Sequence, residues 1–132
     1  MRGVTRGVTL PRVPLRCLIV DDNASFLQAA GAFLERECVT VVGVASNAAD
    51  ALRQAQELRP DVVLVDIMLG AESGFDVARD LGEADAGGPT VIMISTHAEE
   101  DFEELIEAAP AAGFLAKSEL SARAVRRLAG VA

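Results

Sequence analysis

The sequence predicts an α/β fold in which helices cover both faces of a parallel β-sheet. Five short apolar runs alternate along the chain with segments whose apolar residues recur at helical spacing, which is the pattern of such a fold. The run Val62–Leu69 (VVLVDIML) is apolar and β-branched, as expected of a strand buried on both faces. Its one charged residue, Asp66, should lie at the rim of the sheet, where partners or water can reach it.

Length and charge limit what the chain can be. Its 132 residues suit one domain, and no apolar stretch approaches the roughly 20 residues of a membrane span. The formal net charge of −8 argues against nucleic-acid binding, because phosphate backbones are held mainly by lysine and arginine. We therefore expect a soluble domain that binds neither nucleic acid nor a membrane directly.

The first fifteen residues differ from the rest. Residues 1–15 (MRGVTRGVTLPRVPL) mix glycine, proline and arginine without a sustained period, so we predict a flexible basic extension, with the folded domain over residues 16–132. Cys17 and Cys38 are too few for a disulfide framework and follow no secretory segment. A reduced, cytoplasmic protein is the simpler interpretation.

The first half of the domain contains two strand–helix units. The first strand, Cys17–Val20, ends at Asp21 and Asp22. The next helix should turn inward its apolar residues Phe26, Ala29, Ala30, Phe33 and Leu34. The second strand, Val39–Val44, precedes a helix that starts near Asn47. Its inner face should carry Ala48, Ala51, Leu52 and Ala55.

Three further units follow. After the strand that ends on Asp66, a loop leads to a helix with Phe75, Ala78 and Leu81 on its inner face. Thr90–Ile94 is the fourth strand, and the helix after it should bury Phe102, Leu105, Ile106 and Ala109. Gly113–Ala116 is a short fifth strand. Ser121 can cap a last helix whose inward residues are Ala124, Val125 and Leu128.

The ends of these strands predict a functional site. Right-handed crossovers place the carboxyl ends of parallel strands at one edge, where such sheets bind their ligands. The residues that reach this edge are three acids, two hydroxyls and one ammonium: Asp21, Asp22, Asp66, Ser95, Thr96 and Lys117. Carboxylates that meet require a cation, and hard oxygen ligands suit Mg²⁺.

This combination is suited to phosphoryl transfer. A carboxylate can act as a nucleophile and form an aspartyl phosphate, while a cation and an ammonium stabilise the transferring group. The simplest assignment makes Asp66 the acceptor, with Asp21 and Asp22 holding the metal. Lys117 then supplies the counter-charge, and Ser95 donates a hydrogen bond to the new phosphoryl group.

The motifs LIVDDN, VVLVDIML, VIMIS and GFLAKSEL, in this order and spacing, resemble the receiver domain of two-component response regulators, from about Leu15 to the end. The resemblance implies a flavodoxin-like (βα)5 three-layer sandwich with strand order 2-1-3-4-5, the order found in flavodoxin and in the chemotaxis regulator. It also implies phosphoryl transfer to Asp66 from a histidine kinase or a small phosphodonor. The backbone carbonyl of Met68 would help to hold Mg²⁺.

The resemblance further implies a switch without enzyme turnover beyond self-phosphorylation and self-dephosphorylation. Ser95 and Phe114 would move together and change the surface formed by the fourth helix, fifth strand and fifth helix, which would control an output such as transcription. GFLAKSEL looks most like the subfamily that carries helix-turn-helix output domains. Thr96 stands where alanine or glycine is usual, beside the phosphoryl pocket, so we expect slow self-dephosphorylation. Gly70 stands where many receivers have proline.

Several alternatives remain at this point. An aspartyl-nucleophile phosphohydrolase would usually carry a second Asp where this chain has Met68. A module that keeps the fold without phosphorylation is a third class, and Asp21 or Asp22 could merely cap the first helix. The acidic run from Glu99 to Glu107 suggests a solvated helix face, or else a homodimer contact with the arginines of the last helix. The domain could stand alone or precede an output domain.

Overall fold

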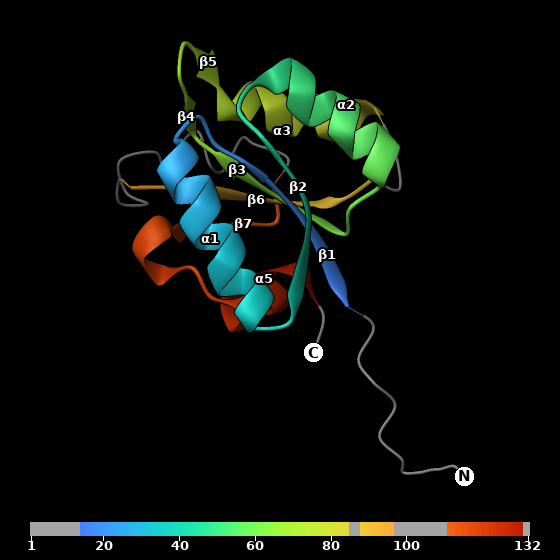
Figure 1. Cartoon of the computed structure of the whole chain (residues 1–132). Helices are drawn as coiled ribbons and strands as arrows, with labels where there is room; N and C mark the ends of the chain where they lie inside the picture. Colours follow the sequence, from blue (N-terminus) through green and yellow to red (C-terminus); the bar gives the residue numbers. More distant parts are fainter. Residues whose placement is uncertain (1–13, 85–87, 97–110, 131–132) are drawn as a thin grey trace, which may run out of the picture.

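The computed structural model describes residues 14–84, 88–96 and 111–130, and its centre is a five-stranded parallel sheet. The strands are β1 (Leu15–Val20), β2 (Val39–Ala45), β3 (Val62–Asp66), β6 (Thr90–Ser95) and β7 (Gly113–Ala116). Their spatial order is β2-β1-β3-β6-β7, and every neighbouring pair is parallel (Figure 1). The flavodoxin-like order 2-1-3-4-5 is therefore confirmed.

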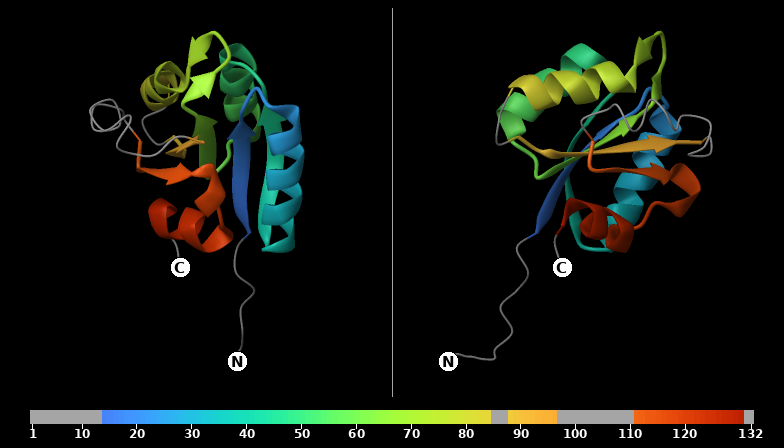
Figure 2. Two further views of the ribbon diagram at one scale, coloured as in Figure 1. Left: turned by 90° about the vertical axis from the view of Figure 1, so that its left-hand side faces the viewer. Right: turned by 180° about the vertical axis from the view of Figure 1, so that it is seen from behind.

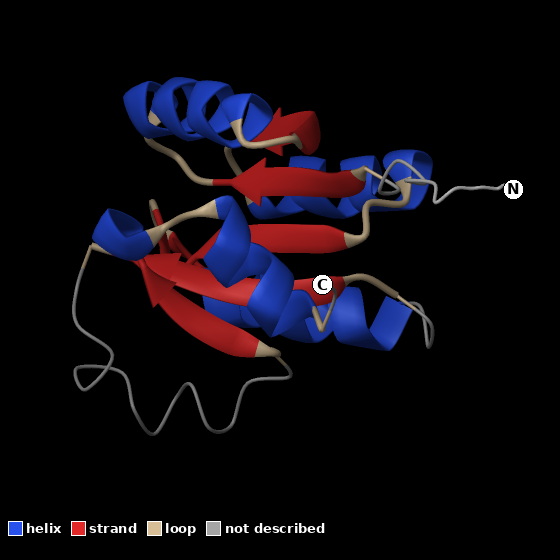
Figure 3. Ribbon diagram, turned by 90° about the horizontal axis from the view of Figure 1, so that it is seen from below, coloured by secondary structure: helices blue, strands red, loops and turns tan. Residues whose placement is uncertain are grey.

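Helices cover the sheet on both sides. The helices α1 (Ala24–Arg36) and α5 (Ala122–Ala129) lie on one face, while α2 (Ala48–Leu58) and α3 (Gly74–Ala84) lie on the other (Figures 2 and 3). Because side chains alternate along a strand, β1 contributes residues to the hydrophobic cores on both faces of the sheet. Its residues Cys17 and Ile19 face α1 and α5, whereas Leu18 and Val20 face α2 and α3. The three-layer sandwich follows from this alternation.

Polar side chains begin three of the helices. The side chains of Asn23 and Asn47 accept hydrogen bonds from the backbone N–H groups of Phe26 and Asp50, and they cap α1 and α2. Ser121 caps α5 as expected, through the N–H of Ala124. The suggestion that Asp21 or Asp22 caps the first helix is wrong, since Asn23 has that role. Ala29, expected on the inner face of α1, is exposed because the buried stripe is narrower.

Three short elements were not predicted from the sequence. The third strand, β3, ends at Asp66 as expected, and the rest of the run Val62–Leu69 leaves the sheet as β4 (Met68–Leu69). It pairs antiparallel with β5 (Glu72–Ser73), so that Gly70 and Ala71 form a two-residue hairpin loop. A 3-10 helix, η2 (Lys117–Glu119), follows β7. The helix predicted around Phe102–Ala109 and the extension over residues 1–13 lie outside the described residues.

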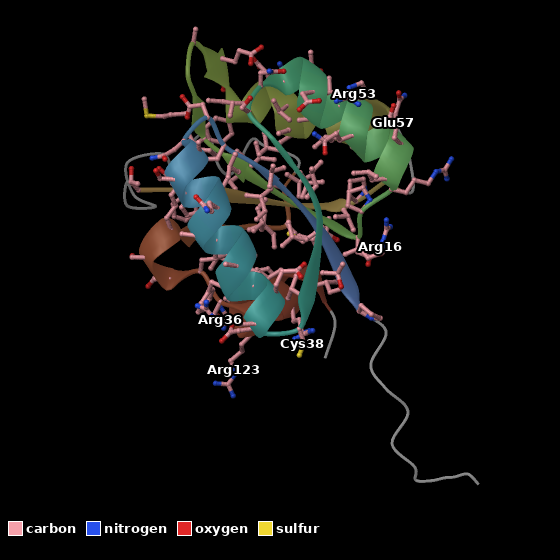
Figure 4. All side chains as sticks on the ribbon, viewed as in Figure 1. Arg16, Arg36, Cys38, Arg53, Glu57 and Arg123 are labelled. Atoms are coloured by element: carbon pink, nitrogen blue, oxygen red, sulfur yellow. The ribbon has the colours of Figure 1, made fainter. Side chains whose placement is uncertain are left out.

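The two cysteines lie in different surroundings. Cys17 is buried in β1, and burial raises the pKa of its thiol to about 12, which fits a packing role. Cys38 is exposed and lies with Arg36 and Arg123 near the carboxyl end of α1, as the labels in Figure 4 show. Within the described residues, no helix combines the length and apolar character needed to cross a membrane.

Candidate functional site at the carboxyl edge of the sheet

Three carboxylates meet where β1 and β3 end. Asp21 and Asp22 follow β1, Asp66 is the last residue of β3, and one ligand oxygen from each lies within 4.8 Å of the others. Asp21 is fully buried, Asp66 is 7% exposed and Asp22 is exposed. The apolar residues of both strands are buried, so the carboxylates emerge from the core at its rim. The prediction that these acids share one place agrees with this geometry.

Lys117 reaches the same place from the start of η2. Its Nζ atom lies 2.5 Å from Oδ2 of Asp21 and 3.5 Å from Oδ2 of Asp66. The lysine side chain is 12% exposed, so its ammonium is largely removed from water. One positive charge therefore faces three acidic groups, and the pocket keeps an excess of negative charge.

The electrostatics of Asp66 reflect this imbalance. Burial, and then the nearby carboxylate of Asp21, raise the pKa of Asp66 to about 6. Lys117 and the backbone N–H of Met68 act in the opposite direction, the latter donating to Oδ1 of Asp66 over 3.3 Å. These two donors do not fully offset the cost of charging Asp66, and a further cation would stabilise the carboxylate.

The donor set fits a hard divalent cation. The buried Oδ2 atom of Asp21 has an ion-pair contact with Lys117 but no aligned hydrogen bond among the described residues. Asp22 adds an exposed carboxylate, and water can complete a coordination shell on that side. Oxygen ligands of this kind favour Mg²⁺ over softer metals.

The hairpin after Asp66 is held tightly against the site. The N–H of Gly74 donates to the carbonyl of Ile67 over 2.8 Å, and a Cβ atom at position 74 would lie 2.0 Å from the carbonyl oxygen of Asp66. Gly70 has a φ of +62°, which proline cannot adopt, so this loop differs in conformation from one that carries proline there. The side chain of Glu72 accepts a hydrogen bond from the N–H of Ala48 at the start of α2.

The remaining predicted residues lie on β6 and β7. Ser95 ends β6, is 1% exposed and pairs in register with Ala116, the neighbour of Lys117. Thr96 follows and is exposed. Phe114 on β7 is partly buried and packs on the α2–α3 side of the sheet. The edge of the sheet thus gathers Ser95 and Lys117 beside the acids, while Phe114 lies three residues before Lys117 along β7.

The sequence did not reveal three residues that contribute to the site. Asn23 caps α1, Phe26 places its ring 4.3 Å from Nζ of Lys117, and Glu72 connects the hairpin to α2. Asn23 carried a usable signal, because asparagine before a helix is a common cap. Phe26 was predicted only as a core residue of α1, since helical spacing says nothing about a ring that faces a distant lysine.

A comparison with protein families decides the identity of this fold. The family model described as "Response regulator receiver domain" matches residues 17–129 of the chain. The chain belongs to the response regulator receiver family. Receivers of this family are generally signalling modules without catalysis of their own, and they are typically phosphorylated on an aspartate and bind Mg²⁺ at an acidic pocket.

Related receivers occur in proteins with different outputs. A protein-glutamate methylesterase/protein-glutamine glutaminase of Symbiobacterium thermophilum is 37% identical over 97 residues, which are 72% of this chain and 26% of that protein. The DNA-binding response regulator MtrA of Mycobacterium leprae is 41% identical over 78 residues, 59% of this chain and 34% of that one. The receiver thus spans about a quarter to a third of these two relatives.

Solved receiver structures are similar over most of the chain. The signal receiver domain of the putative response regulator NarL from Mycobacterium tuberculosis has a TM-score of 0.77 and 30% identity, covering 89% of this chain and 97% of that one. A LuxR-family regulator from Aurantimonas has a TM-score of 0.79 and 25% identity, covering 90% of this chain and 88% of that one. The likeness to regulators with DNA-binding outputs, expected from GFLAKSEL, is confirmed.

Proposed function

We propose that Asp66 accepts a phosphoryl group from a histidine kinase and that this modification switches the receiver. The observation that carries the proposal is the position of Lys117, whose ammonium lies between the carboxylates of Asp21 and Asp66. A free carboxylate alone would be a poor acceptor for an anionic donor. A carboxylate flanked by a buried ammonium and a candidate metal site can accept one.

The transfer itself is a displacement at phosphorus. An oxygen of Asp66 forms a bond to the phosphorus atom of a phosphohistidine, the P–N bond breaks, and the imidazole leaves with its electron pair and takes up a proton. Asp21, Asp22, Asp66 and the carbonyl of Met68 would hold Mg²⁺, which offsets charge on the phosphoryl oxygens when it is bound. Lys117 would contact one of these oxygens, and Ser95 would donate its hydroxyl to another.

The switch would act through β6 and β7. A phosphoryl group on Asp66 adds negative charge next to Ser95, and the serine hydroxyl would turn toward it. Phe114 would then follow into the space that Ser95 leaves, so that the surface of β7 and α5 changes. We infer an output of transcriptional control in the cytoplasm, through a DNA-binding domain or a homodimer, because the relatives include a transcriptional regulatory protein and a DNA-binding response regulator.

The test is phosphorylation by a small donor. Incubation with Mg²⁺ and phosphoramidate should give an acid-stable, hydroxylamine-labile phosphate on the wild type and none on Asp66→Asn. Absence of the modification from the wild type would contradict the proposal. Continuous turnover of a phosphate ester would favour the aspartyl phosphohydrolase instead.

A further inference from the structure

The ammonium of Lys117 has an aromatic neighbour as well as its acidic ones. The ring of Phe26, on the first turn of α1, lies with its centroid 4.3 Å from Nζ of Lys117. On the carboxylate side, the same nitrogen contacts Asp21 and Asp66. A cation within about 6 Å of a ring centroid is attracted by the negative face of the ring. The ammonium is therefore stabilised from two sides.

Hydrogen bonds from the pocket fix the position of this ring. Oδ1 of Asp21 accepts a hydrogen bond from the N–H of Asn23 over 2.8 Å. The side chain of Asn23 in turn accepts one from the N–H of Phe26 over 3.1 Å. Phe26 then faces Lys117, and Lys117 returns to Oδ2 of Asp21. These four residues form a closed circuit that connects the candidate metal ligand to the ammonium through α1.

The ring of Phe26 and the two carboxylates interact with the ammonium in different ways. Asp21 and Asp66 accept its N–H groups, whereas the face of Phe26 attracts the charge without occupying a lone-pair acceptor site. When Asp21 is engaged by a cation, Lys117 loses part of its nearest ion pair. The ring still attracts the ammonium, and its N–H groups become available to a phosphoryl oxygen.

We propose that Phe26 is a positioning residue that holds the ammonium of Lys117 over the acceptor carboxylate through a cation–π contact. The proposal rests on the proposed function of Asp66 and adds a residue to it. Phe26 touches neither donor nor metal and acts only through Lys117. Its role depends on the negative face of the ring and is separate from the packing of Phe26 on the core beneath α1.

A direct readout of this contact exists because Lys117 is the only lysine in the chain. Lysine labelled with ¹³C and ¹⁵N therefore gives one set of side-chain signals, and the protons next to Nζ report the ring current of Phe26. These protons should be shifted upfield in the wild type and in Phe26→Tyr, and the shift should vanish in Phe26→Leu. Equal shifts in the wild type and Phe26→Leu would overturn the contact.

The functional readout is the rate of phosphorylation by phosphoramidate at saturating Mg²⁺. Phe26→Leu should slow it about five-fold, as expected from loss of a partly desolvated cation–π contact, and Phe26→Tyr should restore it. Replacing Phe26 alone by phenylalanines with one, two and three ring fluorines should lower the rate stepwise. Fluorine weakens the negative potential at the face of the ring and changes the size of the ring little. A phosphorylation rate that does not change with fluorination would therefore overturn the proposal.

A matched control separates positioning from packing. Phe33 lies on the same helix, is partly buried and packs against the same core cluster as Phe26. Phe33→Leu should lower the stability to urea about as much as Phe26→Leu but leave the rate unchanged. Equal slowing by both variants would mean a structural role only. If the wild type itself is not phosphorylated, the proposed function fails, whereas a phosphorylated wild type with an unaffected Phe26→Leu refutes only the role of Phe26.

Discussion

The first two strand–helix units of this domain are built alike and yet differ in chemistry. In both, a parallel strand leads through a short loop to a helix whose asparagine cap binds the N–H three residues on: Asn23 with Phe26 over 3.1 Å, and Asn47 with Asp50 over 2.9 Å. The strand β1 lies inside the sheet between β2 and β3, while β2 lies at its edge. The strand–loop–helix arrangement that the two units share therefore determines the path of the backbone but not the chemistry of the loop.

The residues that follow each strand make the difference. Asp21 and Asp22 follow β1 and lie close to Asp66 at the end of the neighbouring strand β3, whereas β2 ends in Ala45 and is followed by Ser46. The start of α2 instead binds the side chain of Glu72 in the hairpin beyond Asp66. One unit thus supplies the candidate metal ligands, and the other supports the loop next to them.

The largest expected effect comes from removing a polar group at each of the two strand ends in turn. Loss of a partner outside the ligand shell already costs metal sites roughly 10- to 100-fold in affinity. Asp22 is itself a candidate ligand, so Asp22→Asn should weaken Mg²⁺ binding by at least about a hundredfold. Ser46→Ala, at the matching end of β2, should leave it unchanged. Calorimetric titration suits the measurement, since the chain lacks Trp and Tyr. Equal Mg²⁺ affinities for both variants would show that the residues after β1 and β2 do not differ in metal binding.

The second effect concerns stability. The pKa of Asp66 is raised to about 6 from 3.8, so the folded state binds a proton more tightly than the unfolded chain, and the charged carboxylate destabilises the fold as pH rises from about 4 to 6. Without Mg²⁺, Asp66→Asn should therefore be more stable than the wild type at pH 7, by up to about 3 kcal/mol.

Urea unfolding followed by circular dichroism at pH 3.5 and pH 7 tests this prediction. The difference between Asp66→Asn and the wild type should be small at pH 3.5, where the carboxyl group is mostly protonated in both states. A difference of the same size at both pH values would show that packing, and not the buried charge, sets the stability.

The two helix caps provide a third comparison. Asn23→Ala and Asn47→Ala each remove one capping hydrogen bond and should each lower the free energy of unfolding by about 1 kcal/mol. Only Asn23→Ala should also slow phosphorylation of Asp66, because the cap of α1 holds Phe26 over Lys117. If both variants slowed phosphorylation to the same degree, the effect would reflect stability alone.

The smallest expected effect is on the lifetime of the phosphorylated state. Thr96 is exposed directly after Ser95. We predict that its side chain hinders a water molecule that attacks the aspartyl phosphate. Thr96→Ala should shorten the lifetime of the aspartyl phosphate in a phosphate-release assay, with no change in the rate of its formation. A lifetime that stays the same or increases would refute the assignment of this position.

Apolar patterning predicted the sheet well because its strands are buried. The runs in β1, β3 and β6 are nearly all apolar, and right-handed crossovers then bring Asp21, Asp66 and Lys117 to one edge. Lys117 could be selected from the sequence because it is the only lysine and follows a strand directly. The strands and the residues at their ends could be predicted because both depend on the order of residues along the chain.

The features that escaped prediction depend on short or distant contacts. The strands β4 and β5 have two residues each, too few to show any period, and their pairing follows from the glycine conformation at Gly70. The ring of Phe26 meets Lys117, which is far away along the chain, through a side-chain orientation that helical spacing does not specify. Ala29 shows the converse, since an apolar residue at the expected spacing can still face water.

Mapping the modified residue tests the central claim most directly. Wild-type protein treated with phosphoramidate and Mg²⁺ can be reduced with borohydride, which converts an aspartyl phosphate to homoserine, and then digested and sequenced by mass spectrometry. The geometry of the pocket predicts homoserine at position 66 and at no other aspartate. Homoserine at Asp21 or Asp22, or an unmodified Asp66 in fully folded protein, would contradict it.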